Sequence, residues 1–174
     1  MKTDIVAAPS RRTVARAIAL LVATLPLAAL AGTPIDKRAT ADPTGTVEIS
    51  NTAGSVMVTG WDRNEVEVTG ELGKGTERLD FTRSDTVTRI KVVLPDRSHN
   101  VDDTDLVVKV PAGSQVSINT VSADIGVRAV RGTQRLQSVS GDLRTETSGE
   151  GVDCRTVSGA VTIAGTGKKG RVST

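Results

Sequence analysis

The chain has 174 residues, a length typical of one domain, and a formal net charge of +2 at pH 7. Only 1% of its residues are aromatic, which argues against stacking platforms for single-stranded nucleic acid. The single cysteine, Cys154, excludes an intramolecular disulfide. Stability must therefore come from backbone pairing and from a core of small and β-branched side chains.

The first 31 residues predict a secretory signal peptide. Four basic residues precede an apolar run from Ala17 to Ala31, which ends in Ala-Leu-Ala. This order of a basic start, a short apolar segment and small residues is typical of cleaved export signals. The run contains Pro26 and is shorter than the ~20 residues that span a bilayer. We expect a signal helix, no transmembrane span after cleavage, and export to the periplasm, the outer-membrane surface or the medium.

Cleavage changes the charge of the protein. The remainder carries 18 Lys and Arg residues and 19 Asp and Glu residues, a net charge of −1. Proteins that bind nucleic acid present a basic patch or stripe, so no nucleic-acid partner is expected.

The next segments predict a linker and then short strands. Residues 32–45 contain two prolines and no apolar period, which indicates a flexible linker. From Thr46 apolar residues alternate with polar ones, in pairs separated by turn residues. The pairs are Val47 and Ile49, Val56 and Val58, and Val66 and Val68. Such alternation is typical of half-buried strands, and no amphipathic helix follows the signal.

An 18-residue repeat begins at Thr120. Blocks 120–137, 138–155 and 156–173 share the core [S/T]-V-S-[G/A]-[D/A]-[I/L/V]. A fixed period is typical of repeat proteins, in which stacked units place like residues above one another at about 4.8 Å. The sequence therefore predicts an all-β protein: a single-stranded β-helix, or β-solenoid, of 18-residue coils over residues 46–174.

The repeat also predicts which residues form the core and which form the turns. The predicted stacked core consists of Val121, Ile125, Val139, Leu143, Val157 and Val161. The predicted structural turn consists of Asp124, Gly141, Asp142 and Gly159. Glycine permits positive φ in such a turn, and aspartate can accept hydrogen bonds from nearby backbone amides.

The repeat resembles a known family. The segment SVSGDL at 138–143, with its copies at 120–125 and 156–161, is similar to the S-G-D-I repeat of a bacterial putative-adhesin family of unknown function. Residues 47–72, with Gly54 and the Trp61-Asp62 pair, resemble the opening of that family. The resemblance implies an exported, right-handed β-helix-like fold in the cell envelope and supplies no catalytic residues. Family members usually carry more repeats, so we expect a truncated C-terminus whose open edge allows edge-to-edge self-association.

No group of residues matches a catalytic signature, and we expect a non-catalytic scaffold or adhesin-like protein without cofactor or metal. A polysaccharide, a lipid headgroup or a protein could be the partner. The alternative is a carbohydrate-active β-helix enzyme, a lyase or glycosidase, which needs paired carboxylates in a groove.

The densest acidic run, 102–105, favours a turn over a calcium site. Cys154 and His99 could pair as nucleophile and base, but Cys154 falls at an apolar phase and is predicted to be a buried structural thiol.

Overall fold

The computed structural model describes residues 32–96, 101–147, 149–165 and 170–173, and this part of the chain is all-β. The predicted signal helix over 1–31 lies outside the described residues, as does His99. The strands are β1 (Thr33–Thr40), β2 (Thr46–Trp61), β3 (Glu65–Leu72), β4 (Arg78–Ser84), β5 (Val87–Val93), β6 (Thr104–Pro111), β7 (Gln115–Val130), β8 (Gln134–Ser140), β9 (Leu143–Thr147), β10 (Val152–Ser158), β11 (Val161–Gly165) and β12 (Gly170–Ser173).

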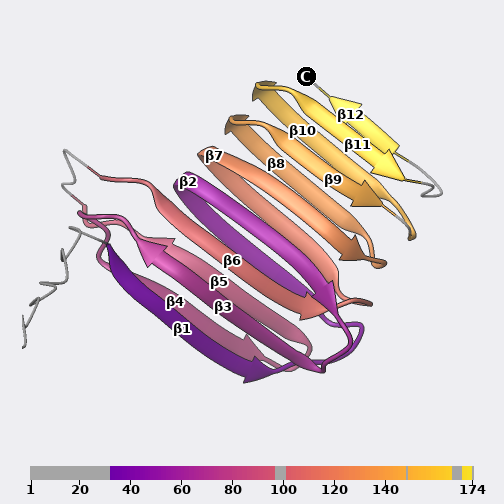
Figure 1. The fold of residues 1–174 in the computed structure, drawn as a ribbon, viewed down its shortest axis with the longest axis horizontal. Coiled ribbons are helices and arrows are strands. Elements are labelled where there is room, and N and C mark those ends of the chain that lie inside the picture. Colours follow the sequence, from indigo (N-terminus) through magenta and orange to yellow (C-terminus); the bar gives the residue numbers. More distant parts are fainter. Residues whose placement is uncertain (1–31, 97–100, 148, 166–169, 174) are drawn as a thin grey trace, which may run out of the picture.

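All twelve strands belong to one mixed sheet with two arms, which the long strands β2 and β7 join. The first arm contains β4, β5, the N-terminal halves of β2 and β7, and then β8, β10 and β12. The second arm contains β1, β3, β6, the C-terminal halves of β2 and β7, and then β9 and β11. Figure 1 shows the strands side by side from β1 and β4 at one end to β11 and β12 at the other.

The core combines inward side chains from both arms. Ile49, Ile90 and Ile118 come from the first arm, and Leu106 and Ile125 come from the second. Each is at most 1% exposed. Alternate residues of a strand point to opposite faces, so one set fills this core and the other forms the outer faces of the arms.

The prediction of a β-solenoid over 46–174 is wrong. A solenoid repeats one unit whose contacts are confined to its neighbours, and its strands run in one direction. Here β3 pairs antiparallel with both β1 and β6, and β4 pairs antiparallel with β5. Strand β2 pairs with β5, β6 and β7, so its partners lie far along the chain. The mixed sheet is not closed, and the repeat extends over only part of it.

The 18-residue spacing corresponds to the register of the parallel strands in the C-terminal part. Ile118 pairs with Leu136, and Leu136 pairs with Cys154. In the second arm Ile125 pairs with Leu143, which pairs with Val161. Equivalent residues are therefore neighbours across hydrogen-bonded strands.

The segment expected to be a flexible linker, 32–45, contains strand β1. Thr33–Thr40 pairs antiparallel with β3 along its whole length. Only Ile35 of this strand is buried, so the segment shows little apolar periodicity in the sequence. Pairing with β3 supplies the backbone hydrogen bonds that the local pattern did not predict.

Candidate functional site

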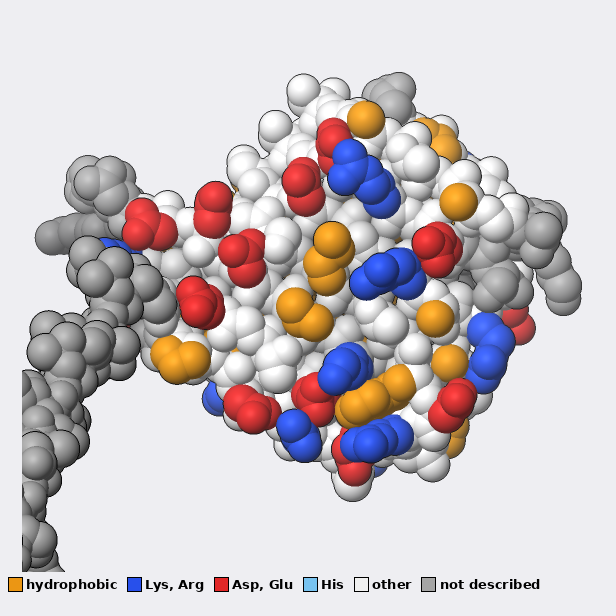
Figure 2. All heavy atoms as spheres, viewed as in Figure 1, with side chains coloured by type: hydrophobic (Ala, Val, Ile, Leu, Met, Phe, Trp, Pro, Cys, Tyr) orange, Lys and Arg blue, Asp and Glu red, His pale blue; other side chains and the backbone are white. Residues whose placement is uncertain are grey.

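The outer face of the second arm, here called the second-arm face, carries the most distinctive arrangement of side chains. Its strands bury Val66, Val68, Leu106 and Val108, so the residues between these point outward. Cross-strand pairing aligns the outward residues in rows that run across the strands. Figure 2 shows this face, with acidic side chains along its left side and Lys and Arg side chains mixed with further acidic ones in its centre and right.

One row is acidic. In the strand register Glu71 lies opposite Asp105, Asp105 lies opposite Ser55, and Ser55 lies opposite Asp124. Asp142 follows, because its backbone N–H donates to Asp124 Oδ1 at 2.8 Å. We call Glu71, Asp105, Asp124 and Asp142 the acidic row. Several of these carboxylates serve the fold: Ser55 Oγ donates to Asp105 Oδ1 at 2.6 Å, and Asp142 Oδ1 accepts from the Ala160 amide at 3.0 Å.

An apolar stripe lies beside the acidic row. Val107 and Met57 are cross-strand neighbours on β6 and β2, and they are 44% and 46% exposed. The next residue across is Gly126 on β7, and the Met57 side chain lies against it. These two large apolar side chains are exposed on a strand face whose other side forms the core.

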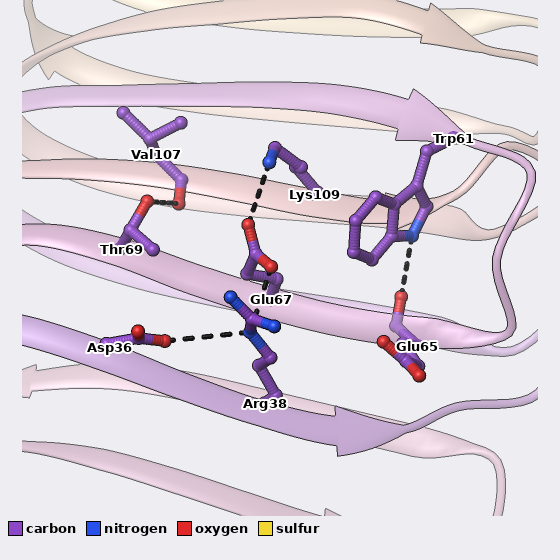
Figure 3. Close-up of polar contacts among 8 residues, drawn as sticks. All are labelled: Asp36, Arg38, Trp61, Glu65, Glu67, Thr69, Val107 and Lys109. Carbon is purple, nitrogen blue, oxygen red and sulfur yellow. Dashed lines mark hydrogen bonds and ion pairs between the residues drawn. The ribbon is translucent and has the colours of Figure 1, made fainter.

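A buried carboxylate lies on the other side of the stripe (Figure 3). The Glu67 side chain is only 8% exposed, although it points away from the core. Lys109 Nζ donates to its Oε1 at 2.8 Å, and Arg38 Nε lies 2.9 Å from its Oε2. The Lys109 hydrogen bond, followed by the charges of Arg38 and Lys109, holds the pKa of Glu67 below its ordinary value. Glu67 therefore stays ionised and neutralises part of the cationic charge around it.

Trp61 at the end of β2 belongs to the same cluster. Its indole Nε1 donates to the Glu65 carbonyl at 2.8 Å, which fixes the ring. The Lys109 ammonium lies 5.4 Å from the ring centroid, and the Arg63 guanidinium lies 5.1 Å from it. Both distances are within the range of cation–π attraction. Lys109 thus links the buried carboxylate to the aromatic ring.

A hollow of about 300 Å³ lies on this face at the C-terminal end of the stripe. Its lining residues are Met57, Gly126, Val127, Arg128, Arg144, Thr145, Glu146, Thr162 and Ala164. They come from β2, β7, β9 and β11, so the hollow crosses four neighbouring strands. It combines an apolar floor with charged groups at its rim.

The predicted turn residues lie together at the corner that joins the arms. Asp124 and Asp142 each accept a backbone N–H from the residue 18 positions ahead, Asp142 and Ala160 respectively. Gly141 has φ +151°, and a Cβ there would lie 2.4 Å from the Ala123 carbonyl oxygen. Gly159 has φ +147°, and a Cβ there would lie 2.1 Å from the Gly141 carbonyl oxygen.

The predicted stacked core is partly wrong. Ile125 and Leu143 are buried, and Val161 packs against the core. Val121, Val139 and Val157 are instead 50%, 51% and 78% exposed. At the corner the inward positions belong to the preceding hydroxyl residues, Thr120, Ser138 and Thr156, which are buried. The chain bends there, and the smaller hydroxyl side chains occupy the inside of the bend.

The remaining candidates have structural roles. Cys154 is fully buried, as predicted, and burial raises the pKa of its thiol to about 11. In the acidic run, Asp102 donates its backbone N–H to the Lys74 carbonyl at 2.9 Å. No cluster of three or more metal-ligating side chains occurs within the described ranges. Over the same part of the chain, no helix has the length and hydropathy of a membrane span.

Sequence reasoning missed the charged cluster and the hollow. In the sequence Val66-Glu67-Val68, Glu67 occupies an ordinary outward position of an alternating strand. Its burial depends on Arg38 and Lys109, which come from two other strands. The sequence signal for the hollow is Gly126, because Arg144 and Thr162 occupy the equivalent positions of the next two blocks.

No family model matches the chain, and no curated protein matches it. Several solved structures are similar in part. A putative cell adhesion protein from Clostridium sporogenes has 8% identity and a TM-score of 0.36, over 82% of this chain and 100% of that one. A putative adhesin from Parabacteroides distasonis has 14% identity and a TM-score of 0.38, over 81% and 69%. One from Parabacteroides merdae has 10% identity and a TM-score of 0.30, over 82% and 97%. Likenesses this weak decide neither the fold nor the function of this chain.

Proposed function

We propose that this chain is an exported, non-catalytic protein of the cell envelope with an adhesin-like binding role, and that the second-arm face is its binding surface. The observation that carries the proposal is the apolar stripe. Met57 and Val107 are almost half exposed, and they lie between the acidic row and the cations of Arg38 and Lys109. An apolar centre bordered by charged groups is the usual anatomy of a recognition surface.

The chemistry of the carboxylates supports binding over hydrolysis. A glycosidase needs a carboxylic acid whose raised pKa keeps it protonated for donation to the leaving group. Glu67, the most buried carboxylate of this face, has a lowered pKa because Lys109 donates to it. Asp105, Asp124 and Asp142 accept hydrogen bonds from Ser55 and from backbone amides that hold the strands in register.

The exported location is supported by the sequence of residues 1–31, with its basic start, short apolar run and Ala-Leu-Ala exit. The adhesin-like role is supported by the resemblance of the S-V-S-G-D-L repeat to the putative-adhesin family. Its partner is then an envelope component: a polysaccharide, a lipid headgroup or a protein.

A binding assay with paired variants tests the proposal. The full protein, expressed with its signal segment, is located by cell fractionation, purified and added to immobilised envelope polysaccharide, lipid vesicles and envelope proteins. We expect Met57→Ser/Val107→Ser to abolish retention. The matched control is Val139→Ser/Val157→Ser, which removes exposed valines away from this face and should leave retention unchanged.

The outcomes separate the candidate functions. Equal retention of both double variants would place the binding surface elsewhere. A protein that stays in the cytoplasm after fractionation would overturn export. Loss of polysaccharide chain length during incubation, measured as a fall in viscosity, would favour the carbohydrate-active enzyme.

A further inference from the structure

The hollow on the second-arm face exists because one side chain is missing. Gly126 lies in the middle of β7 and has no positive φ, so its backbone does not require glycine. A Cβ at this position would lie 2.3 Å from Met57 Sδ. Gly126 therefore allows Met57 to lie across the strand. It also leaves a space on β7, whereas the equivalent positions of the next two strands carry the side chains of Arg144 and Thr162.

Two arginines are available at the rim. Gly126 pairs with Arg144 across the strands, and Arg128 lies on the same face two residues farther along β7. Both arginines line the hollow, and the register of β7 with β9 shifts between Val127 and Val130, so Arg128 has no direct partner on β9. The Arg128 side chain is exposed on this face. Arg144 Nη2 donates to Asp142 Oδ2 at 3.4 Å, and the Arg144 side chain is 70% exposed.

The other groups of the hollow suit a ligand with hydroxyl groups. Glu146 and Thr162 offer an acceptor and a hydroxyl beside the arginines, and Met57 offers an apolar surface. At about 300 Å³ the hollow is at the small end of ligand sites, and it opens onto the stripe. An acyl chain would need deeper burial, because its whole length is apolar. A sugar ring, with one apolar face and polar edges, needs only partial cover.

We propose that this hollow binds a carboxylate-bearing sugar, the acidic unit of an envelope or host polysaccharide. Arg128 and Arg144 bind the carboxylate, for which the arginine fork is well shaped. Met57 packs on the apolar face of the ring, and Glu146 and Thr162 bind ring hydroxyls. This inference rests on the proposed binding role of the second-arm face and names its ligand.

Calorimetric titration of the purified protein tests the site. The probe is a short oligomer of galacturonic acid, and its methyl ester is the uncharged match. We expect the acid to bind and the ester to bind at least about tenfold more weakly, since charge-assisted bonds are lost. Arg128→Gln/Arg144→Gln should lower the affinity for the acid by about tenfold or more. Arg135→Gln/Arg155→Gln, on the outer face of the first arm, should leave it within about twofold.

A second variant fills the hollow without touching charge. Gly126→Val should weaken binding as much as loss of the arginines, with an unchanged circular dichroism spectrum. Inorganic phosphate and octanoate are titrated in parallel. Equal affinity for acid and ester, equal loss in both arginine variants, or tighter binding of phosphate or octanoate than of the acid would overturn the assignment. If no uronate binds while Met57→Ser/Val107→Ser still abolishes envelope retention, this inference fails and the proposed function stands.

Discussion

The outer faces of the two arms cover the same core but distribute charge differently. On the first arm opposite charges alternate along one cross-strand row. Arg89 forms an ion pair with Glu48 at 2.8 Å, and Arg135 lies 3.9 Å from Asp153. Arg155 adds a third cation, 3.6 Å from Asp153. On the second arm four acids form one row, and an exposed apolar stripe separates this row from the Lys109 and Arg38 cations that hold Glu67.

This difference shows where selection for binding can act. The inward residues of both arms must fit one core, so they are restricted to similar apolar side chains. The outward residues have no such restriction, and surface ion pairs stabilise a fold little. A face of paired charges offers few free groups to a ligand, whereas the second arm also exposes the apolar stripe of Met57 and Val107.

The largest effect is expected at the corner that joins the arms. Gly141→Ala introduces a Cβ at a positive φ and 2.4 Å from a backbone oxygen, so we expect a loss of about 3 kcal/mol in the free energy of unfolding in urea. Gly126→Ala meets only the flexible end of Met57 and should cost less than about 0.5 kcal/mol. Similar losses for the two variants would mean that the arms do not depend on this corner.

The next effect concerns a polar contact between the arms inside the core. Gln134 of β8 is fully buried and accepts a hydrogen bond from Thr145 Oγ1 of β9. Thr145→Val leaves the Gln134 oxygen without a donor, and we expect a loss of about 2 kcal/mol. Both arms should unfold together, with Trp61 fluorescence and circular dichroism giving the same midpoint.

A double variant provides the control for this contact. The register neighbours of Gln134 are Val116 and Val152, so Gln134→Val/Thr145→Val would continue an apolar column. It should recover part of the stability lost in Thr145→Val, because Gln134→Val also removes the hydrogen bond from Gln134 Nε2 to the Val130 carbonyl at 3.2 Å. Gln134→Val alone measures the loss of the bond to Val130, and losses of the two single variants that simply add in the double variant would show that the Thr145 hydrogen bond is not the cause.

A pH-dependent effect is expected on the second arm. The folded pKa of Glu67 is below its unfolded value, so its contribution to stability is complete above the unfolded pKa of about 4.5 and is lost as pH falls through the folded pKa. Glu67→Gln should therefore show a smaller decrease in urea midpoint than the native protein between about pH 5 and pH 2. Identical pH profiles would mean that Arg38 and Lys109 do not stabilise the carboxylate.

The smallest effect is expected on the first arm. Arg135 is 60% exposed, and Asp153 keeps its contact with Arg155 when Arg135 is replaced. Arg135→Gln should change the free energy of unfolding by at most about 0.5 kcal/mol. A loss above about 1 kcal/mol would indicate that these ion pairs act as a network, and the contrast between the arms would then be one of stability as well as of binding.

Much of the local structure could be predicted from the sequence. The alternation of Val47 with Ile49 and of Val56 with Val58 correctly indicates strand β2, and all four residues are buried. The repeat correctly aligns Ile125 with Leu143, since a period of apolar residues reflects strand register. It misplaced Val121, because an apolar residue at a corner can lie outside the bend while a small hydroxyl residue fills the inside.

The sequence by itself determined strands from Thr46 onward such as β2, the spacing of the parallel pairs and the glycine corners, because these depend on neighbouring residues and on a fixed period. Only the tertiary structure decided that β1 pairs with β3, that β3 runs antiparallel to β6, and that Arg38, Glu67 and Lys109 meet. Pairing between strands is selected by the burial of whole faces, and residues 38, 67 and 109 become neighbours only after three strands have assembled.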